Sequence, residues 1–110
     1  MTGQRRYERV AFFCPLQLTV LPDGPTVSAN SFDISAGGVG LTAAVFLERG
    51  KDVRIDFHVR NGSIEETDEC VLGRIAYSRA DEDGNRIGIE FLETIRESAQ
   101  PALTRKLDML

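Results

Sequence analysis

The stretch VRIDFHVRNG, residues 53–62, decides the fold class of this chain. Apolar and polar side chains alternate through it, which is the period of a half-buried β-strand. It ends in Asn61-Gly62, a pair that favours a tight hairpin because both residues accept a positive φ. The stretch therefore predicts a strand that turns back on itself in an antiparallel sheet.

The same period of two recurs on both sides of this stretch. It predicts further strands at 10–20, 26–34, from 39, at 69–79 and at 87–91. Pro15 suggests an edge position or a bulge in the first of them. Short antiparallel strands in so small a chain favour a closed or nearly closed barrel, because closure removes exposed edges. The side chains predicted to share its core are Phe12, Leu18, Val53, Ile55, Ile89 and Phe91.

Only the C-terminal part, 94–110, is expected to be helical. The sequence TIRE at 94–97 matches a capping box, and Pro101 suits the first position of a helix. We expect a short turn and then a helix from about residue 101. One face of this helix carries Leu103, Leu107 and Leu110. The predicted organisation is a single domain over 1–110, with an arginine-rich arm at 1–9, the barrel at 10–93 and this helical segment.

Composition and charge narrow the function classes. The chain has 110 residues, with 13 Lys and Arg against 17 Asp and Glu and a net charge of −4. An acidic balance disfavours a general nucleic-acid binder, whose affinity depends on neutralising many phosphates. No stretch approaches the roughly 20 apolar residues that span a bilayer, and the N-terminal residues lack a signal-peptide core. We therefore expect a cytoplasmic protein without membrane insertion.

No catalytic or metal-binding group emerges from the sequence, so we expect neither an enzyme nor a cofactor. Cys14 and Cys70 are far apart and are interpreted as two buried free thiols. His58, the single histidine, falls on the predicted solvent face of its strand. The acidic segment 81–90 has the wrong residues for a calcium loop and is interpreted as a solvated turn. The GGVG at 37–40 lacks the spacing of a dinucleotide fingerprint.

A cluster of positive charge precedes the first predicted strand. Arg5, Arg6 and Arg9 lie there in an otherwise acidic chain. An arginine can offer a bidentate fork to guanine O6 and N7, stack on a base and pair with a phosphate. From charge alone, a solvated lead-in to the strand would be the favoured interpretation.

The segment DISAGG, residues 33–38, complements these arginines. Asp33 and Ser35 are two residues apart, so in an extended chain their side chains face the same way. Gly37 and Gly38 allow tight bending of the backbone with accessible N–H groups, which suits a phosphate or a purine edge. A carboxylate, a hydroxyl and glycines opposite mobile guanidiniums can hold a guanine nucleotide.

With these two segments the sequence resembles the PilZ domain family, the bacterial receptors for cyclic di-GMP. Arg5 and Arg9 form its RxxxR motif, and Asp33, Ser35 and Gly38 form its D/NxSxxG motif. The resemblance covers essentially the whole chain and includes GRI at 73–75 and IGIEF at 87–91. It implies a six-stranded antiparallel barrel with the ligand held between the arm and the barrel surface.

The resemblance also implies roles by position. Arg5 and Arg9 would take guanine edges, stacking and phosphates, with Arg6 between them. Asp33 and Ser35 would bond a guanine or fix the arginine geometry. Gly38 would keep the path to the site open. Strand placement suggests that Arg74 and Tyr77 line the rim.

The implied function is a cyclic di-GMP receptor that signals through an effector protein when its arm, mobile without ligand, closes over the nucleotide. One alternative is an interaction adaptor of the same fold that no longer binds nucleotide. A second is a nucleic-acid-binding barrel, which the acidic balance and the lack of stacking aromatic triplets disfavour.

Overall fold

The computed structural model describes residues 8–61, 65–82 and 84–108. The predicted mobile arm up to residue 7, including Arg5 and Arg6, lies outside the described residues. The same is true of the hairpin turn at Gly62 and of Leu110.

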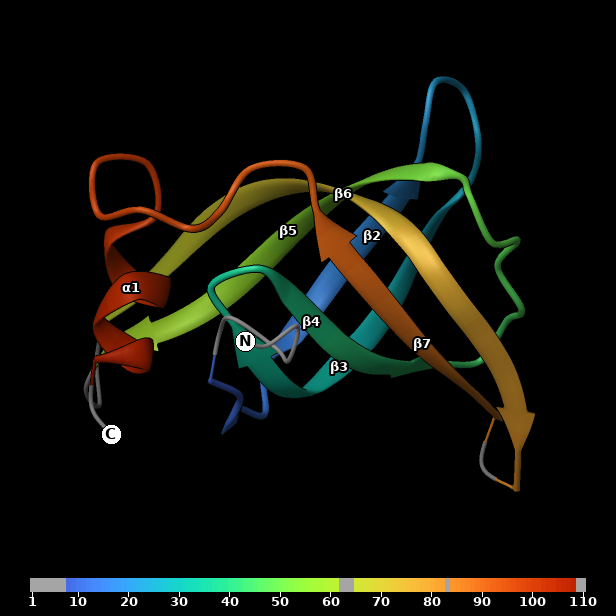
Figure 1. The fold of residues 1–110 in the computed structure, drawn as a ribbon, viewed down its shortest axis with the longest axis horizontal. Helices are drawn as coiled ribbons and strands as arrows, with labels where there is room; N and C mark the ends of the chain where they lie inside the picture. The colour runs from blue at the N-terminus through green and yellow to red at the C-terminus, as the bar shows by residue number, and fades with distance from the viewer. Residues whose placement is uncertain (1–7, 62–64, 83, 109–110) are drawn as a thin grey trace, which may run out of the picture.

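The described residues form seven strands and one helix, and Figure 1 shows them as a twisted barrel with the helix at one end. Six of the strands pair in the order β2 (Pro15–Val20), β5 (Asp52–Asn61), β6 (Glu65–Asp81), β7 (Gly84–Phe91), β4 (Gly38–Ala43) and β3 (Thr26–Ser35), and β3 pairs with β2 to close the ring. All of these pairings are antiparallel. The predicted six-stranded antiparallel barrel with a C-terminal helix is therefore confirmed. The elements are β1 Val10–Ala11, β2 Pro15–Val20, β3 Thr26–Ser35, β4 Gly38–Ala43, β5 Asp52–Asn61, β6 Glu65–Asp81, β7 Gly84–Phe91 and α1 Pro101–Leu107.

The first predicted strand, 10–20, is in fact two strands. The two-residue β1 pairs with β3, and the segment 12–14 then separates it from β2. Buried Ser31 holds this segment, because its hydroxyl donates to the Phe12 carbonyl at 2.6 Å and accepts the Cys14 N–H at 3.0 Å. Pro15 begins β2, which lies between β3 and β5, so the suggested edge position is wrong. A first strand position tolerates proline because no ladder N–H is required there.

The interior of the barrel is filled by the inward side chains of alternating residues. All six predicted core residues are buried, and Leu18, Val53 and Ile55 are fully so. Phe57 is also fully buried, and its ring centroid lies 6.3 Å from that of Phe12. The residues described include no helix with the length and apolar character needed to cross a membrane.

The helix α1 begins at Pro101, as expected, but it is capped differently from the prediction. TIRE ends before the helix starts, and the N-cap residue Gln100 makes no side-chain capping bond. The buried carboxylate of Glu69, on β6, instead accepts the N–H groups of Ala102 at 2.7 Å and Leu103 at 2.9 Å. A negative group at a helix N-terminus satisfies orphan donors and faces the positive end of the helix dipole.

Glu69→Ala is expected to lower the free energy of unfolding by about 1–3 kcal/mol, because it leaves two buried N–H donors without acceptors. Glu69→Gln should lose less, since one acceptor oxygen remains. Urea denaturation measures both, with the exposed Glu97→Ala as the matched control. Equal stability of Glu69→Ala and Glu97→Ala would contradict a capping role.

The two cysteines differ, which corrects the prediction that both are buried. Cys14 is buried, and its thiol donates to the His58 carbonyl at 3.2 Å. Burial raises the pKa of this thiol to about 11. Cys70 is exposed on the outer face of β6, because its neighbours Glu69 and Val71 are the residues that point inward. Partial desolvation raises the pKa of Cys70, and the negative charge of Asp56 raises it further.

A thiol reagent at about pH 8 is expected to label Cys70 and to leave Cys14 unmodified in the folded protein, since exposure and thiolate character set the rate. Both pKa values are raised, so labelling should accelerate as the pH increases. Mass spectrometry of Cys70→Ser and Cys14→Ser variants identifies the labelled site. Rapid labelling of Cys70→Ser without unfolding would contradict the burial of Cys14.

Candidate functional site

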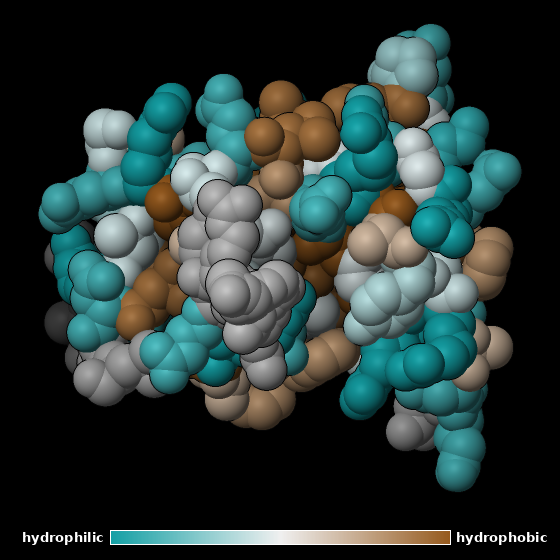
Figure 2. Space-filling model, in the orientation of Figure 1, coloured by the Kyte–Doolittle hydropathy of each residue, from teal (hydrophilic) through white to brown (hydrophobic). Residues whose placement is uncertain are grey.

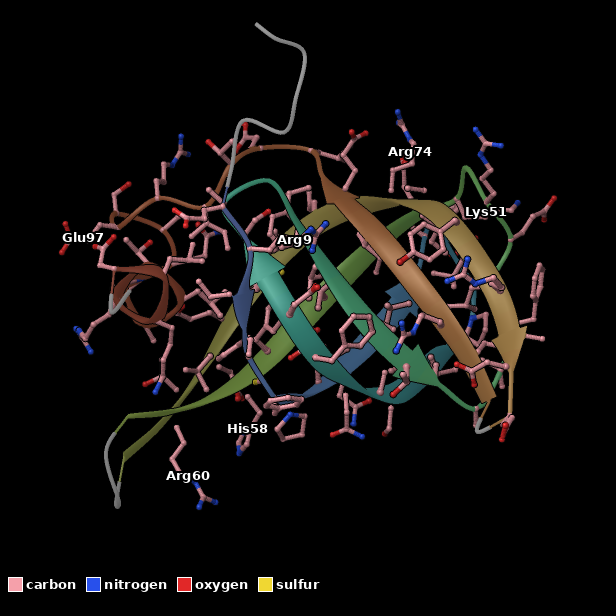
Figure 3. All side chains as sticks on the ribbon, turned by 60° about the horizontal axis from the view of Figure 1, so that its bottom comes forward. Arg9, Lys51, His58, Arg60, Arg74 and Glu97 are labelled. Carbon is pink, nitrogen blue, oxygen red and sulfur yellow. The ribbon has the colours of Figure 1, made fainter. Side chains whose placement is uncertain are left out.

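An ion pair between Arg9 and Asp33 joins the start of β1 to β3. The short β1 pairs Val10 with Ile34 and Ala11 with Asp33, which brings the preceding Arg9 beside the Asp33 carboxylate. Arg9 Nη1 donates to Asp33 Oδ1 at 2.7 Å, and the side chains are 39% and 30% exposed. The same oxygen accepts the Gly40 N–H of β4 at 3.1 Å. Arg9 therefore lies against the β3–β4 face, where Figure 3 labels it.

A β-bulge explains why this pair lies on the outer surface. The register of β3 against β4 shifts between Ser31 and Asp33, and both Ser31 and Ile34 are buried. The two consecutive residues between them, Phe32 and Asp33, are consequently turned outward. A bulge re-aims side chains in this way next to binding sites.

Gly40 lies directly beneath both of these side chains. A Cβ at this position would come within 2.7 Å of both Asp33 Oδ1 and the Phe32 ring. Any larger residue would push the carboxylate and the ring away from β4. Glycine at position 40 is therefore a requirement of the site, and the sequence reasoning did not single it out.

The predicted residues Ser35, Gly37 and Gly38 shape the turn between β3 and β4. The buried Ser35 hydroxyl accepts the Gly37 N–H at 3.2 Å and faces the Gly38 carbonyl at 3.5 Å. A Cβ on Gly38 would lie 2.6 Å from the Ile89 carbonyl and 3.6 Å from Arg9 Nη2. These residues thus set the path of the backbone beside Arg9, and the Ser35 hydroxyl is already engaged within the turn.

Arg74 lies on the same outer surface but is not in contact with the Arg9–Asp33 pair. Its Nε donates to Asp52 Oδ1 of β5 at 2.8 Å, and this bond raises the pKa of the Arg74 guanidinium. In the sheet, Arg74 of β6 pairs with Glu90 of β7, and Glu90 pairs on its other side with Gly38 of β4. In Figure 3 Arg74 projects away from the barrel, apart from Arg9.

Two aromatic rings cover a pair of glycines next to the ion pair. Gly40 of β4 lies opposite Gly88 of β7 in the sheet. The Phe32 ring covers Gly40, and the Tyr77 ring of β6 covers Gly88 so closely that no Cβ would fit beneath it. A second bulge, between Ile75 and Tyr77, turns the tyrosine outward. Two bulged strands therefore flank the β4–β7 pair and place a ring over each glycine.

Positive charge lies beside these rings. The Arg86 guanidinium is 4.6 Å from the Phe32 ring centroid, and that of Arg79 is 5.8 Å from the Tyr77 centroid. Arg79 and Arg86 face each other across β6 and β7. Like charges opposite each other are unfavourable without a counter-ion. Figure 2 shows hydrophilic and hydrophobic residues side by side on the front face, across which β4 and β7 run in Figure 1.

Tyr77 was suggested as a rim residue from the sequence, whereas the Phe32 ring and the arginine beside it, Arg86, were missed. The sequence signal that could have found Phe32 and Arg86 is weak. Phe32 is a single aromatic residue before Asp33, and Arg86 is one polar residue of an alternating strand. Their meeting depends on the bulge and on the pairing of β4 with β7, and neither is visible in local sequence.

His58 is exposed on β5 as predicted, with Nδ1 2.6 Å from Asp68 Oδ1. Within the described segments, no three His, Cys, Asp or Glu side chains gather as metal ligands would. A half-exposed guanidinium, a carboxylate and two accessible rings suit a planar ligand that carries negative charge.

One family model and several solved structures are similar to this chain. The family model described as PilZ domain matches residues 3–108. The fold resembles Bacillus subtilis inhibitor of motility (MotI/DgrA), with a TM-score of 0.72 and 16% identity, over 98% of this chain and 54% of that chain. It also resembles the PilZ domain of Escherichia coli YcgR solved with c-di-GMP, with a TM-score of 0.60 and 18% identity, over 98% of this chain and 100% of that chain.

A structure of Escherichia coli YcgR in complex with c-di-GMP has a TM-score of 0.70 and 20% identity, over 96% of this chain and 46% of that chain. This chain thus spans about half the length of the MotI and YcgR chains. No curated protein matches the sequence.

Proposed function

Because the chain belongs to the PilZ domain family, we propose that it is a receptor for cyclic di-GMP. The observation that carries this proposal is the ion pair of Arg9 with Asp33 at 2.7 Å, on an outer face that also presents the half-buried Phe32 ring and the exposed Tyr77 ring. The pair joins the two sequence motifs that the resemblance singled out. Two structural neighbours were solved with c-di-GMP, which supports the same ligand here.

In the proposed complex, Arg9 offers its free guanidinium N–H groups to a guanine edge or a phosphate. Asp33 fixes the orientation of Arg9 and keeps a second oxygen for a guanine N–H. Arg5 and Arg6 join from the arm, and Gly37 and Gly38 allow the nucleotide to approach the turn. Arginine suits this role because its planar fork matches both guanine and phosphate.

We further propose that the arm closes on the bound nucleotide and that the protein acts through an effector protein. A dianionic ligand would remove the repulsion among Arg5, Arg6 and Arg9 and so favour the closed arm. Arg5→Lys should then weaken binding nearly as much as Arg5→Ala, because an ammonium cannot make the fork or the stack. Backbone NMR relaxation of 4–9 should show ordering on addition of cyclic di-GMP, and an arm that is already rigid would contradict the closure.

Isothermal titration calorimetry tests the receptor proposal. Cyclic di-GMP should bind with saturable heat, while GMP and GTP at the same concentrations should bind far more weakly. Equal binding of all three would point to a general anion surface. No binding of cyclic di-GMP would leave an interaction adaptor of the same fold, the alternative that the sequence left open.

A further inference from the structure

Two opposed arginines lie on the β6–β7 part of the outer face. Arg79 of β6 and Arg86 of β7 are direct partners across the two strands, and both residues are exposed. Residues directly opposite each other in an antiparallel pair have Cβ atoms only about 4.5–5.5 Å apart. The pairing of the strands therefore holds two positive charges close together.

The protein provides counter-charges for other arginines but not for these two. Four arginines in the described ranges are each in an ion pair with a carboxylate, namely Arg9, Arg54, Arg74 and Arg96. Arg79 and Arg86 form no ion pair within those ranges, although Asp and Glu outnumber Lys and Arg by 17 to 13. On β7 the positions two residues to either side of Arg86 are Gly84 and Gly88, which bring no charge to its face. The opposed arginines thus form an uncompensated positive centre.

Aromatic rings fix the positions of both guanidiniums. That of Arg86 lies 4.6 Å from the centroid of the Phe32 ring, and that of Arg79 lies 5.8 Å from the centroid of the Tyr77 ring. A guanidinium that stacks on a ring keeps its N–H donors for an anion, because the donors point outward in the plane of the group. Side chains that are already positioned lose less entropy when they bind. The two forks are therefore prepared for an anion that lies between them.

A phosphate suits this centre better than a carboxylate. A carboxylate has two oxygens and one charge, which a single bidentate arginine can satisfy. A phosphate has more acceptor oxygens and more charge, so it can accept forks from two arginines at once. The outer face of a stacked guanidinium also suits a planar base, since arginine stacks on aromatic groups on either side. Phosphate and base together make a nucleotide the complementary ligand.

We propose that Arg79 and Arg86 form a second anion site, which takes a phosphate group of a nucleotide. Arg86 is four residues along β7 from Glu90, which pairs with Gly38 next to Arg9. The new site thus lies about 13 Å along the strand from Arg9. Figure 1 shows the hairpin end of β6 and β7 at the opposite end of the barrel from α1. The phosphate can belong to a cyclic di-GMP that also reaches Arg9, or to a separate nucleotide.

The test follows the arginine side-chain Nε–H signals of the ¹⁵N-labelled full chain during titration with sodium pyrophosphate. The signals of Arg79 and Arg86 should shift and saturate, and pyrophosphate should raise the Tm. Arg79→Gln and Arg86→Gln should each weaken pyrophosphate binding by about tenfold. The matched control is Arg54→Gln, which removes the same charge from an exposed arginine of β5 and should keep the affinity within about twofold.

Several results would overturn the proposal. Equal losses in Arg54→Gln and Arg86→Gln, or shifts centred on other arginines, would mean that anions are attracted only by general charge. Full affinity in Arg86→Lys would contradict the fork, because an ammonium keeps the charge but not the geometry. GDP should bind more tightly than pyrophosphate, since its base can stack on a guanidinium, and weaker binding of GDP would exclude a nucleotide.

Titration with cyclic di-GMP identifies the source of the phosphate. If cyclic di-GMP shifts the signals of Arg9 and Arg86 together and displaces pyrophosphate, both centres bind the same molecule. If pyrophosphate still binds to the protein saturated with cyclic di-GMP, the site takes a separate nucleotide.

The site does not rest on the receptor proposal, and the two can fail separately. Asp33→Ala should leave pyrophosphate binding unchanged, and loss of that binding would count against an independent site. A protein that binds pyrophosphate at Arg79 and Arg86 but does not bind cyclic di-GMP would retain the anion site without the receptor function.

Discussion

Phe57→Ala is expected to lower the free energy of unfolding by about 3–5 kcal/mol. Phe57 lies in the middle of β5, is fully buried and packs on the Phe12 ring. Removal of its ring leaves a cavity that the closed barrel cannot collapse to fill, because β5 is paired on both sides. Domains of this size have a total stability of roughly 5–15 kcal/mol, so this single substitution would remove a large share of the free energy of unfolding.

Chemical denaturation of the two proteins measures this loss, with Phe46→Ala as the control. Phe46 is 63% exposed in the loop after β4, and its removal should change stability by no more than about 0.5 kcal/mol. If Phe57→Ala and Phe46→Ala unfold at the same denaturant concentration, then the interior of the barrel is not where the structure places it.

The second large effect concerns the affinity for cyclic di-GMP. A bidentate arginine contact is worth about 1–3 kcal/mol, so Arg9→Ala should weaken binding by about 5- to 150-fold. Asp33→Ala should weaken the binding of cyclic di-GMP by a similar factor, because Arg9 then loses the carboxylate that orients it. The pair is partly exposed, and an exposed ion pair contributes only about 0–1 kcal/mol to folding. Both variants should therefore melt close to the unmodified protein.

A double-mutant cycle separates a shared role from two independent ones. If Asp33 acts by holding Arg9, the loss in the double variant should be smaller than the sum of the single losses. Strict additivity would mean that each side chain contacts the ligand by itself. The matched control is Arg54→Ala, which breaks an exposed Arg–Asp pair on β5 and should keep full affinity.

The sequence predicts most of the barrel because its signal is local. The alternation of Val53, Ile55, Phe57 and Val59 with polar residues needs only the period of a strand. The break at 12–14 could not be predicted in the same way. It depends on Ser31, which lies in another strand and binds this segment through its hydroxyl.

Glu69 is a second feature that local sequence could not explain. A glutamate at an inward-facing strand position breaks the expected alternation of apolar and polar residues. Its role becomes clear only when α1 is placed, because its carboxylate accepts the N–H groups at the start of that helix. Its inward position also turns Cys70 outward, and this is why the predicted burial of that cysteine was wrong.

Part of the candidate site could be predicted from sequence motifs, and part depends on how the strands pair. Arg9 and Asp33 were predicted because the family motifs name them, and their direct contact agrees with the hypothesis that the carboxylate fixes the arginine. The aromatic cover was not predicted, apart from Tyr77 at the rim. Phe32 faces outward only because of the bulge, and a bulge is a property of two paired strands.

The rings over Gly40 and Gly88 also provide a spectroscopic reporter of this face. Protons held beneath an aromatic ring experience its induced magnetic field, so the α-protons of these two glycines should resonate upfield of ordinary strand glycines. A ligand that slides between ring and backbone, or tilts a ring, would change that shielding without any change in fold. Two signals in a simple proton–carbon spectrum would thus follow occupancy of the outer face in real time, with no label attached to the ligand.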